Sequence, residues 1–310
     1  MDSLNRTATE LVDEAIDFAD ELNVGVHQLD SEALVVDFGV DAPGGIEAGL
    51  MLAEIQTAGL ATVQTRMDEV GGAPLTHVEL STDQPALALL CSQKAGWEIE
   101  TDGFDGLGSG PARALVAREE EFQRIGYRDD FEFAVLCVES ETLPDEGVVE
   151  HVAELAEVAE SGVFLPAFSA ASTTGSTAMA ARAAELAAFR LSELGYDPLD
   201  IRSVAGSAPV APVAGDEETA IARTNDALAY GGQAHVVVDE PFDRFDDVPS
   251  TATAEYGRPF AEIFEDADWD FYEVDESVFA PAQVTIDVIG GDTHVVGDVN
   301  EDLLVESFGL

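Results

Sequence analysis

Apolar positions recur along the whole chain, in short runs and at helical spacing. Residues 33–39 (Ala-Leu-Val-Val-Asp-Phe-Gly) form a run that is typical of a buried strand. Residues 146–160 place apolar side chains on one helical face. Residues 283–288 and 293–296 read as two strands and predict a hairpin across Gly290-Gly291. Alternating strands and helices predict an α/β fold with some antiparallel pairing near the C-terminus.

The chain length suggests two ordinary domains or one large one, because it has 310 residues. Residues 119–130 are polar and mostly charged, which makes them the best candidate linker. We therefore predict a first α/β domain over residues 1–125 and a second over residues 126–310. The prediction does not require either domain to be continuous in sequence.

A long helix predicted around residues 176–194 is nearly all Ala, Leu, Met and Phe between Ala178 and Phe189. Such a helix is apolar around its circumference and should be buried. Arg182 and Glu185 interrupt it with i,i+3 spacing, so both lie on one face. A structural ion pair is one interpretation. The other is a general base with a tunable pKa, because a buried pair rarely improves stability over apolar packing.

A glycine-rich segment, Gly108-Ser109-Gly110-Pro111-Ala112-Arg113, is predicted to be a loop that enters a helix. Exposed backbone N–H groups at such a junction favour an anion, and Arg113 adds positive charge. An ordinary loop-to-helix junction gives the same pattern. The segment matches neither the P-loop nor the dinucleotide fingerprint.

Two further candidates stand out by composition. Lys94 is the single lysine of the chain. It was therefore retained either for a function or by chance. Arg223-Thr224-Asn225-Asp226 lies within a predicted helix. Thr224 and Asn225 are middling helix formers, so both a binding role and a polar outer face fit this segment.

Charge is the strongest global signal, with 63 Asp and Glu against 13 Lys and Arg and a net charge of -50. The acids are spread along the chain, which indicates adaptation to a salt-rich cytoplasm rather than an acidic tail. Nucleic acid is not expected as a partner, because there is no basic patch. No apolar run approaches the roughly 20 residues that span a bilayer, so no membrane is expected. The scattered histidines and two cysteines predict no metal site.

Several segments together resemble the methenyltetrahydromethanopterin cyclohydrolase family, from end to end of the chain. Arg223-Thr224-Asn225-Asp226 is especially specific. The others are Gly44-Gly45-Ile46-Glu47-Ala48-Gly49-Leu50, Gln93-Lys94-Ala95-Gly96-Trp97, Gly108 to Ala114, Ala208-Pro209-Val210-Ala211-Pro212-Val213, Gly231-Gly232, Phe279-Ala280-Pro281-Ala282 and Glu306-Ser307-Phe308-Gly309-Leu310.

The resemblance implies a cytoplasmic enzyme of one-carbon metabolism, a homo-oligomer (a trimer), with its pterin substrate in a cleft between two α/β domains. It implies no metal and no organic cofactor. The reaction is reversible hydrolysis of N5,N10-methenyl-tetrahydropterin to the N5-formyl form. The family's catalytic pair falls on Arg182 and Glu185. For substrate binding we predict Lys94, Gly108, Ser109, Gly110, Arg113, Arg223, Thr224, Asn225 and Asp226.

Alternatives stay open at this point. The same chemistry could act on methenyl-tetrahydrofolate, whose tail bears glutamates. A pterin-dependent formyl transferase would need a site for an acceptor amine. A non-enzymatic pterin carrier would use its acidic surface only for solubility.

Overall fold

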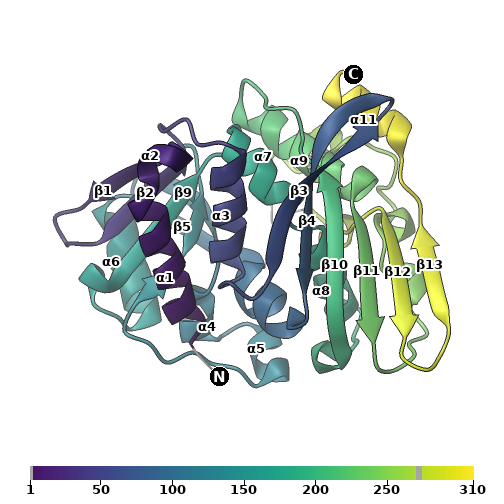
Figure 1. The fold of residues 1–310 in the computed structure, drawn as a ribbon, viewed down its shortest axis with the longest axis horizontal. Helices are drawn as coiled ribbons and strands as arrows, with labels where there is room; N and C mark the ends of the chain where they lie inside the picture. The colour runs from purple at the N-terminus through teal and green to yellow at the C-terminus, as the bar shows by residue number, and fades with distance from the viewer. Residues whose placement is uncertain (1–2, 270–273) are drawn as a thin grey trace. The chain divides into compact units, whose positions relative to one another are not determined.

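The structure is a computed structural model that describes residues 3–269 and 274–310. The chain forms two compact units, coloured along the sequence in Figure 1. Unit 1 comprises Met1–Thr62 and Ala86–Ala178, and unit 2 comprises Val63–Pro85 and Met179–Leu310. Both units are discontinuous in sequence, and the predicted boundary at residue 125 falls inside unit 1. A cleft between two domains stays a prediction.

Unit 1 is built on a 7-stranded mixed sheet. Its strands pair in parallel around the centre and antiparallel towards the edges. In sheet order they are β1 (Gly25–Gln28), β2 (Leu34–Gly39), β9 (Val163–Phe168), β8 (Cys137–Glu139), β6 (Phe104–Ser109) and β5 (Ala95–Thr101), and β7 (Ala134–Val135) pairs with β9. The central strand β9 is buried along its whole length, as expected of a strand covered on both faces.

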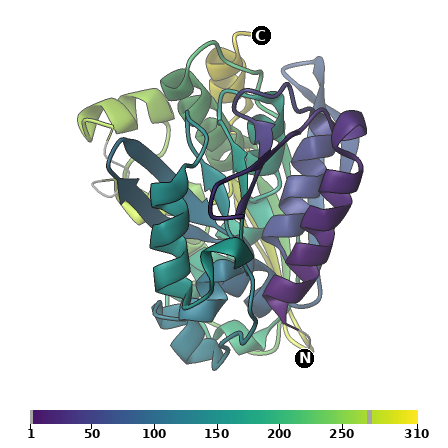
Figure 2. The same cartoon turned by 90° about the vertical axis from the view of Figure 1, so that its left-hand side faces the viewer.

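Helices cover both faces of this sheet. α1 (Leu4–Asp17) and α3 (Ile46–Gln56) contribute to one apolar cluster, and α4 (Ala112–Val116) and α6 (Glu146–Ala156) to another. Figure 2 shows α1 and α6 on opposite sides of the strands. The unit also contains α2 (Ala19–Leu22), α5 (Glu120–Ile125), the 3₁₀ turn η2 (Glu160–Gly162) and an eight-residue π-helix, η1 (Ala86–Gln93). Helix α7 (Thr173–Ala180) begins in unit 1 and ends two residues past its last residue, Ala178.

The predicted linker at residues 119–130 is wrong. These residues include α5, and Phe122 is 2% exposed within the core of unit 1. The prediction failed because we took the charged residues of this segment to be exposed. Two of them, Glu119 and Glu121, instead pair with Lys94 and Arg113.

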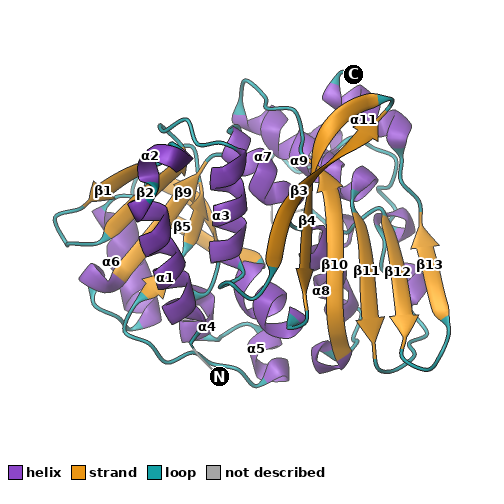
Figure 3. Cartoon of the chain, in the orientation of Figure 1, coloured by secondary structure: helices purple, strands orange, loops and turns teal. Residues whose placement is uncertain are grey.

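Unit 2 is built on a 6-stranded sheet, drawn in orange in Figure 3. In sheet order its strands are β13 (Thr293–Gly297), β12 (Gln283–Val288), β11 (Gln233–Val238), β10 (Ile201–Pro209), β4 (Ala73–Thr82) and β3 (Thr62–Val70). β12 and β13 pair antiparallel as predicted, and β11 with β12 is parallel. The predicted α/β class and the antiparallel pairing near the C-terminus are both confirmed.

Helix α8 (Ala183–Glu193) packs on β10 and β11, and three further helices pack together around an aromatic core. These are α9 (Glu217–Gly231), α10 (Phe260–Asp266) and α11 (Glu301–Phe308). Short 3₁₀ turns complete the unit: η3 (Pro198–Asp200), η4 (Phe245–Asp247), η5 (Ser250–Ala252) and η7 (Glu276–Val278).

The predicted helix over residues 176–194 is buried, but it is not continuous. α7 ends at Ala180 and α8 begins at Ala183, so Arg182 is the N-cap of α8 rather than a mid-helix residue. The Arg182 N–H donates to Met179 O at 3.0 Å, which closes a tight turn at the end of α7. Since Ala, Leu and Met are good helix formers, local propensity alone gave no sign of this break.

Candidate active site

Arg182 and Glu185 form a buried ion pair at the start of α8. Arg182 is 7% exposed and Glu185 is 1% exposed. Arg182 Nε and Nη2 both donate to Glu185 Oε2, at 3.0 and 2.8 Å. Glu185 also lies in the first turn of α8, where the helix dipole favours negative charge.

The first turn of α8 rests directly on strand β10 at Gly206. A Cβ added to Gly206 would lie 2.3 Å from the backbone N of Ala184 and 2.8 Å from its Cα. These distances are far below ordinary contact, so only glycine allows the helix backbone to approach the strand so closely. Gly206 therefore sets the position of the turn that holds Arg182 and Glu185.

Lys94 and Arg113 belong to a network of four charged side chains in unit 1. The Lys94 ammonium pairs with Glu119 Oε2 at 3.3 Å and, more closely, with Glu121 Oε1. Arg113 Nε donates to Glu119 Oε1 at 2.9 Å, and its Nη2 contacts Oε2 of the same carboxylate. Burial alone would raise the pKa of Glu119, but Arg113 and Lys94 together hold that pKa below its ordinary value.

Arg113 is completely buried, and its Nη1 donates to three carbonyl oxygens, those of Leu90, Ser92 and Lys94. It therefore binds carbonyls at the C-terminal end of the π-helix η1 and just beyond it. A π-helix is uncommon and often occurs at functional sites. Arg113 is built into this turn and is not an exposed cation at a loop.

Gly108 and Ser109 do not lie in the predicted loop, whereas Gly110 lies in the short connection that leads into α4. Gly108 and Ser109 are the last residues of β6, and Gly110 follows with φ +103°. The Gly110 N–H donates to Ser92 O at 2.8 Å, so it is not exposed to an anion. Gly108 is needed because its neighbours Trp97 and Leu136 approach within 3.0 and 3.2 Å of where a Cβ would lie. Gly108 was mistaken for part of a loop because close strand packing also requires glycine.

Ser109 lies in a buried polar contact that no sequence motif predicts. Its Oγ accepts a hydrogen bond from Gln56 Nε2 at 3.0 Å, and Gln56 Oε1 is buried without a partner among the described residues. Gln56 is the last residue of α3, in a segment with no motif around it. Glu119 and Glu121 were likewise missed, because no single acid stands out in a chain with 63 of them.

Arg223, Thr224, Asn225 and Asp226 lie within α9, as predicted, and hold unit 2 together in this structure. Thr224 Oγ1 and Asn225 Nδ2 both donate to Ile221 O, one turn earlier. Arg223 Nε donates to Ser307 O at 3.0 Å, and Ser307 Oγ donates to Asp226 Oδ2 at 2.6 Å. Asp226 Oδ1 accepts the N–H of Phe260 at 2.9 Å. This cluster therefore connects α9 to α10 and α11.

Asp226 differs from the paired carboxylates of the protein because its hydrogen-bond donors are neutral. Burial raises its pKa to about 6, although the bonds from Ser307 and Phe260 act in the opposite direction. The residue is 2% exposed. We predicted that residues 223–226 contact a substrate directly, and this stays a prediction.

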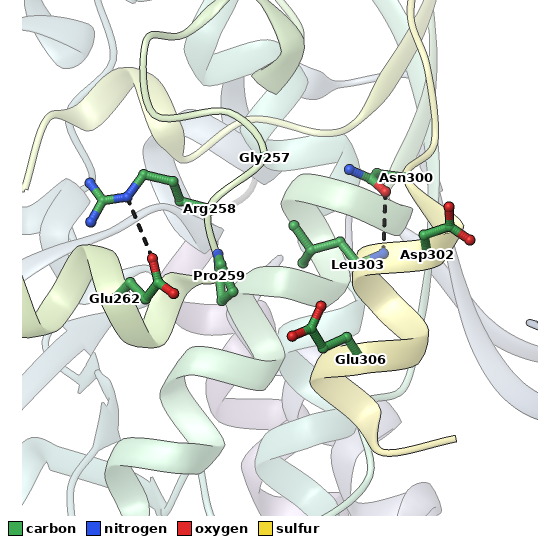
Figure 4. Close-up of a pocket in the computed structure, with 8 residues that line it drawn as sticks. All are labelled: Gly257, Arg258, Pro259, Glu262, Asn300, Asp302, Leu303 and Glu306. Carbon is green, nitrogen blue, oxygen red and sulfur yellow. Dashed lines mark hydrogen bonds and ion pairs between the residues drawn. The ribbon is translucent and has the colours of Figure 1, made fainter.

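A surface pocket of unit 2 lies beside this cluster, between α10 and α11 (Figure 4). Glu262, Asp302 and Glu306 line it together with Arg258, which pairs with Glu262 at 3.7 Å. The excess of carboxylates makes the pocket unfavourable for an anionic ligand. None of the predicted site residues lines it.

The predicted residues therefore fall into three groups. Lys94, the segment from Gly108 to Gly110 and Arg113 lie together in unit 1; Arg182 with Glu185, and Arg223 to Asp226, form two groups in unit 2. In the described part of the chain, no three His, Cys, Asp or Glu side chains converge as a metal site. Within the same residues, no helix combines the length and the hydropathy that crossing a bilayer requires.

The two mixed sheets with their helices define a mixed α/β protein, and the buried, guanidinium-bound carboxylate of Glu185 is its candidate acid–base group. Comparison with known proteins makes this specific. The family model described as Cyclohydrolase (MCH) matches residues 3–308. Methenyltetrahydromethanopterin cyclohydrolase of Halobacterium salinarum is 59% identical over 310 residues, covering 100% of both chains. The corresponding enzyme of Methanocorpusculum labreanum is 40% identical over 314 residues, again with 100% of both chains covered. The chain belongs to this family of cyclohydrolases.

Proposed function

We propose that the protein hydrolyses N5,N10-methenyl-tetrahydromethanopterin reversibly to the N5-formyl form, in one-carbon metabolism. Full-length identity to relatives named for this activity supports the proposal. The observation that carries the mechanism is the Glu185 carboxylate, held through Oε2 by two N–H groups of Arg182. The substrate carbon is an electrophilic amidinium, so the proposed chemistry requires neither a metal nor an organic cofactor.

Glu185 acts as the base and then as the acid. It takes a proton from water while the water oxygen forms a bond to the methenyl carbon. Protonated Glu185 returns that proton to N10 as the carbon–N10 bond breaks, and the hydroxyl proton leaves to solvent as the formyl C=O forms. Arg182 fixes the carboxylate in one rotamer, so little reorganisation is needed at the moment of proton transfer.

Finer assignments accompany this function as proposals. Lys94, Ser109 and the turn around Gly110 bind substrate in unit 1, with Arg113 and Gly108 shaping that turn, and residues 223–226 contribute from unit 2. The enzyme is cytoplasmic. It is a homotrimer, and sedimentation in high salt tests this oligomeric state. The carrier is tetrahydromethanopterin, which an assay with both methenyl-tetrahydromethanopterin and methenyl-tetrahydrofolate tests.

Glu185→Gln tests the mechanism, because it keeps the side-chain volume and removes the base. We expect kcat to fall by about 10²-fold or more, with KM little changed. Loss of the methenyl absorbance after catalytic addition of enzyme measures turnover, and a thermal midpoint checks folding, since Arg182 loses its charged partner. Glu193→Gln, an exposed position on the same helix, is the matched control and should retain full activity.

Two results would contradict the proposal. Wild-type turnover by Glu185→Gln would remove Glu185 from the mechanism. A change of absorbance in the wild type that is only stoichiometric would identify a carrier rather than an enzyme.

A further inference from the structure

Within unit 1, the charges in direct contact with Lys94 and Arg113 balance. Lys94 and Arg113 supply two positive charges, and Glu119 and Glu121 supply two negative charges within direct contact of them. The Glu121 side chain is 8% exposed and that of Lys94 is 17% exposed, so solvent screens these contacts only partly. A site that concentrates positive charge for an anion has the opposite composition.

Arg113 cannot restore a positive field, because its guanidinium is fully engaged. It donates to carbonyls at the end of η1 and contacts both carboxylate oxygens of Glu119. The guanidinium also lies over the Phe122 ring, 5.5 Å from the centroid. Glu119 is thereby fixed on one side by Arg113 and presents Oε2 to Lys94 on the other.

An anion approaching Lys94 would meet both carboxylates at close range. It would have to displace them or accept their repulsion, in a chain whose net charge is already -50. A neutral oxygen acceptor meets no such cost, and a cationic donor held in place by two carboxylates is well suited to orient it.

We propose that Lys94 donates a hydrogen bond to a neutral carbonyl on the substrate's pterin head, not to its anionic tail, and that Glu119 and Glu121 are the positioning residues that aim it. This inference rests on the proposed function, because the head and tail are those of the pterin substrate. It predicts that Lys94 contributes equally to the binding of substrates with and without the tail.

The experiment compares Lys94→Met with wild type on two substrates, the full methenyl-tetrahydropterin and a version truncated before its anionic tail. We expect KM to rise by about 10-fold or more on both, with kcat largely kept, because a charge-assisted hydrogen bond is lost in each case. A penalty confined to the full-length substrate, or no penalty on either, overturns the proposal.

Glu121→Gln and Glu119→Gln give a second test with milder changes. If Lys94 met an anion, removing either carboxylate would lower KM. We expect KM to rise instead, because the ammonium loses its orientation. Glu120→Gln is the matched control, since it is exposed, lies between the two and removes the same charge; its KM should not change. A lower KM in the Glu119 or Glu121 variant contradicts the assignment.

Failure of this inference is separable from failure of the proposed function. If wild type does not turn over the methenyl substrate, the function is wrong. If it does, and Glu185→Gln is inactive while Lys94→Met behaves as wild type, only the role of Lys94 is wrong.

Discussion

Buried acids in this protein are stabilised in two ways that differ at the level of single residues. Glu185 and Glu119 each accept two N–H groups from one arginine. Asp226 accepts from the Ser307 hydroxyl and the Phe260 amide, both of which are neutral donors. A guanidinium offsets the desolvation of a carboxylate, whereas neutral donors do so only in part. The raised pKa of Asp226, about 6, follows from this difference.

Asp226→Asn should therefore change the pH dependence of stability. The pKa of Asp226 lies higher in the folded protein than in the unfolded chain, so the folded state binds the extra proton. Its stabilising contribution is present below about pH 4 and is lost as pH rises through about 6. Asparagine removes the buried charge, so at pH 7 to 8 the variant should be more stable by up to about 3 kcal/mol.

Urea unfolding of both proteins from pH 4 to 8, at constant high salt, measures this difference. The free-energy gap between variant and wild type should shrink towards zero as the pH is lowered. Asp302→Asn, an exposed position on α11, should give a pH-independent gap near zero. Parallel pH profiles for Asp226→Asn and wild type would show that the Asp226 carboxylate does not carry a raised pKa.

At the scale of elements, the start of α8 depends on a close approach to β10. Gly206→Ala would place a methyl group against the backbone of Ala184 and push the first turn of α8 away. Overpacking of this kind costs about 1–3 kcal/mol. Because Glu185 sits in that turn, we also expect kcat to fall by about 10-fold or more with KM nearly unchanged.

Gly297→Ala provides the matched comparison. Gly297 has φ +77° and lies against the carbonyl of Ala282, so alanine is strained there too. Both variants should lower the thermal midpoint, and only Gly206→Ala should lower kcat. Equal kcat in the two variants would mean that Gly206 matters for stability alone.

Elements decided by local patterns were predictable, and elements decided by distant contacts were not. β2 and the β12–β13 hairpin follow from their apolar runs and from Gly290-Gly291. The pair Arg182 and Glu185 was found because two charges interrupt an apolar helix. The π-helix η1 was not predictable, because its terminal carbonyls depend on Arg113, about twenty residues later in the chain.

The strand end at Gly108 and Ser109 shows the same limit. Glycine in a strand and glycine in an anion-binding loop give the same local sequence, and only the neighbouring strands β5 and β8 distinguish them. Likewise, Glu119 becomes recognisable as part of a charged network only once the fold brings it against Lys94 and Arg113.

For the whole molecule, the dominant quantity is the net charge of -50. Most acids lie on the surface, where an individual ion pair contributes little. Their summed repulsion opposes the compact state, and salt reduces it by shortening the Debye length from about 10 Å at 0.1 M to about 3 Å at 1 M. The fold is therefore expected to depend on salt more strongly than on any single contact.

Lowering KCl from about 2 M to 0.1 M should reduce the thermal midpoint markedly, because the Debye length grows beyond the spacing of neighbouring carboxylates. At low salt, acidification from pH 7 to 5 should recover part of the loss by neutralising carboxylates. Repeating the acidification with the Asp226→Asn variant removes the part of the recovery in thermal midpoint that comes from protonation of Asp226. Sucrose separates screening from solute exclusion, since it is excluded from protein surfaces but carries no charge. If sucrose in 0.1 M KCl restored the midpoint as fully as 2 M KCl, exclusion and not charge repulsion would set the salt requirement.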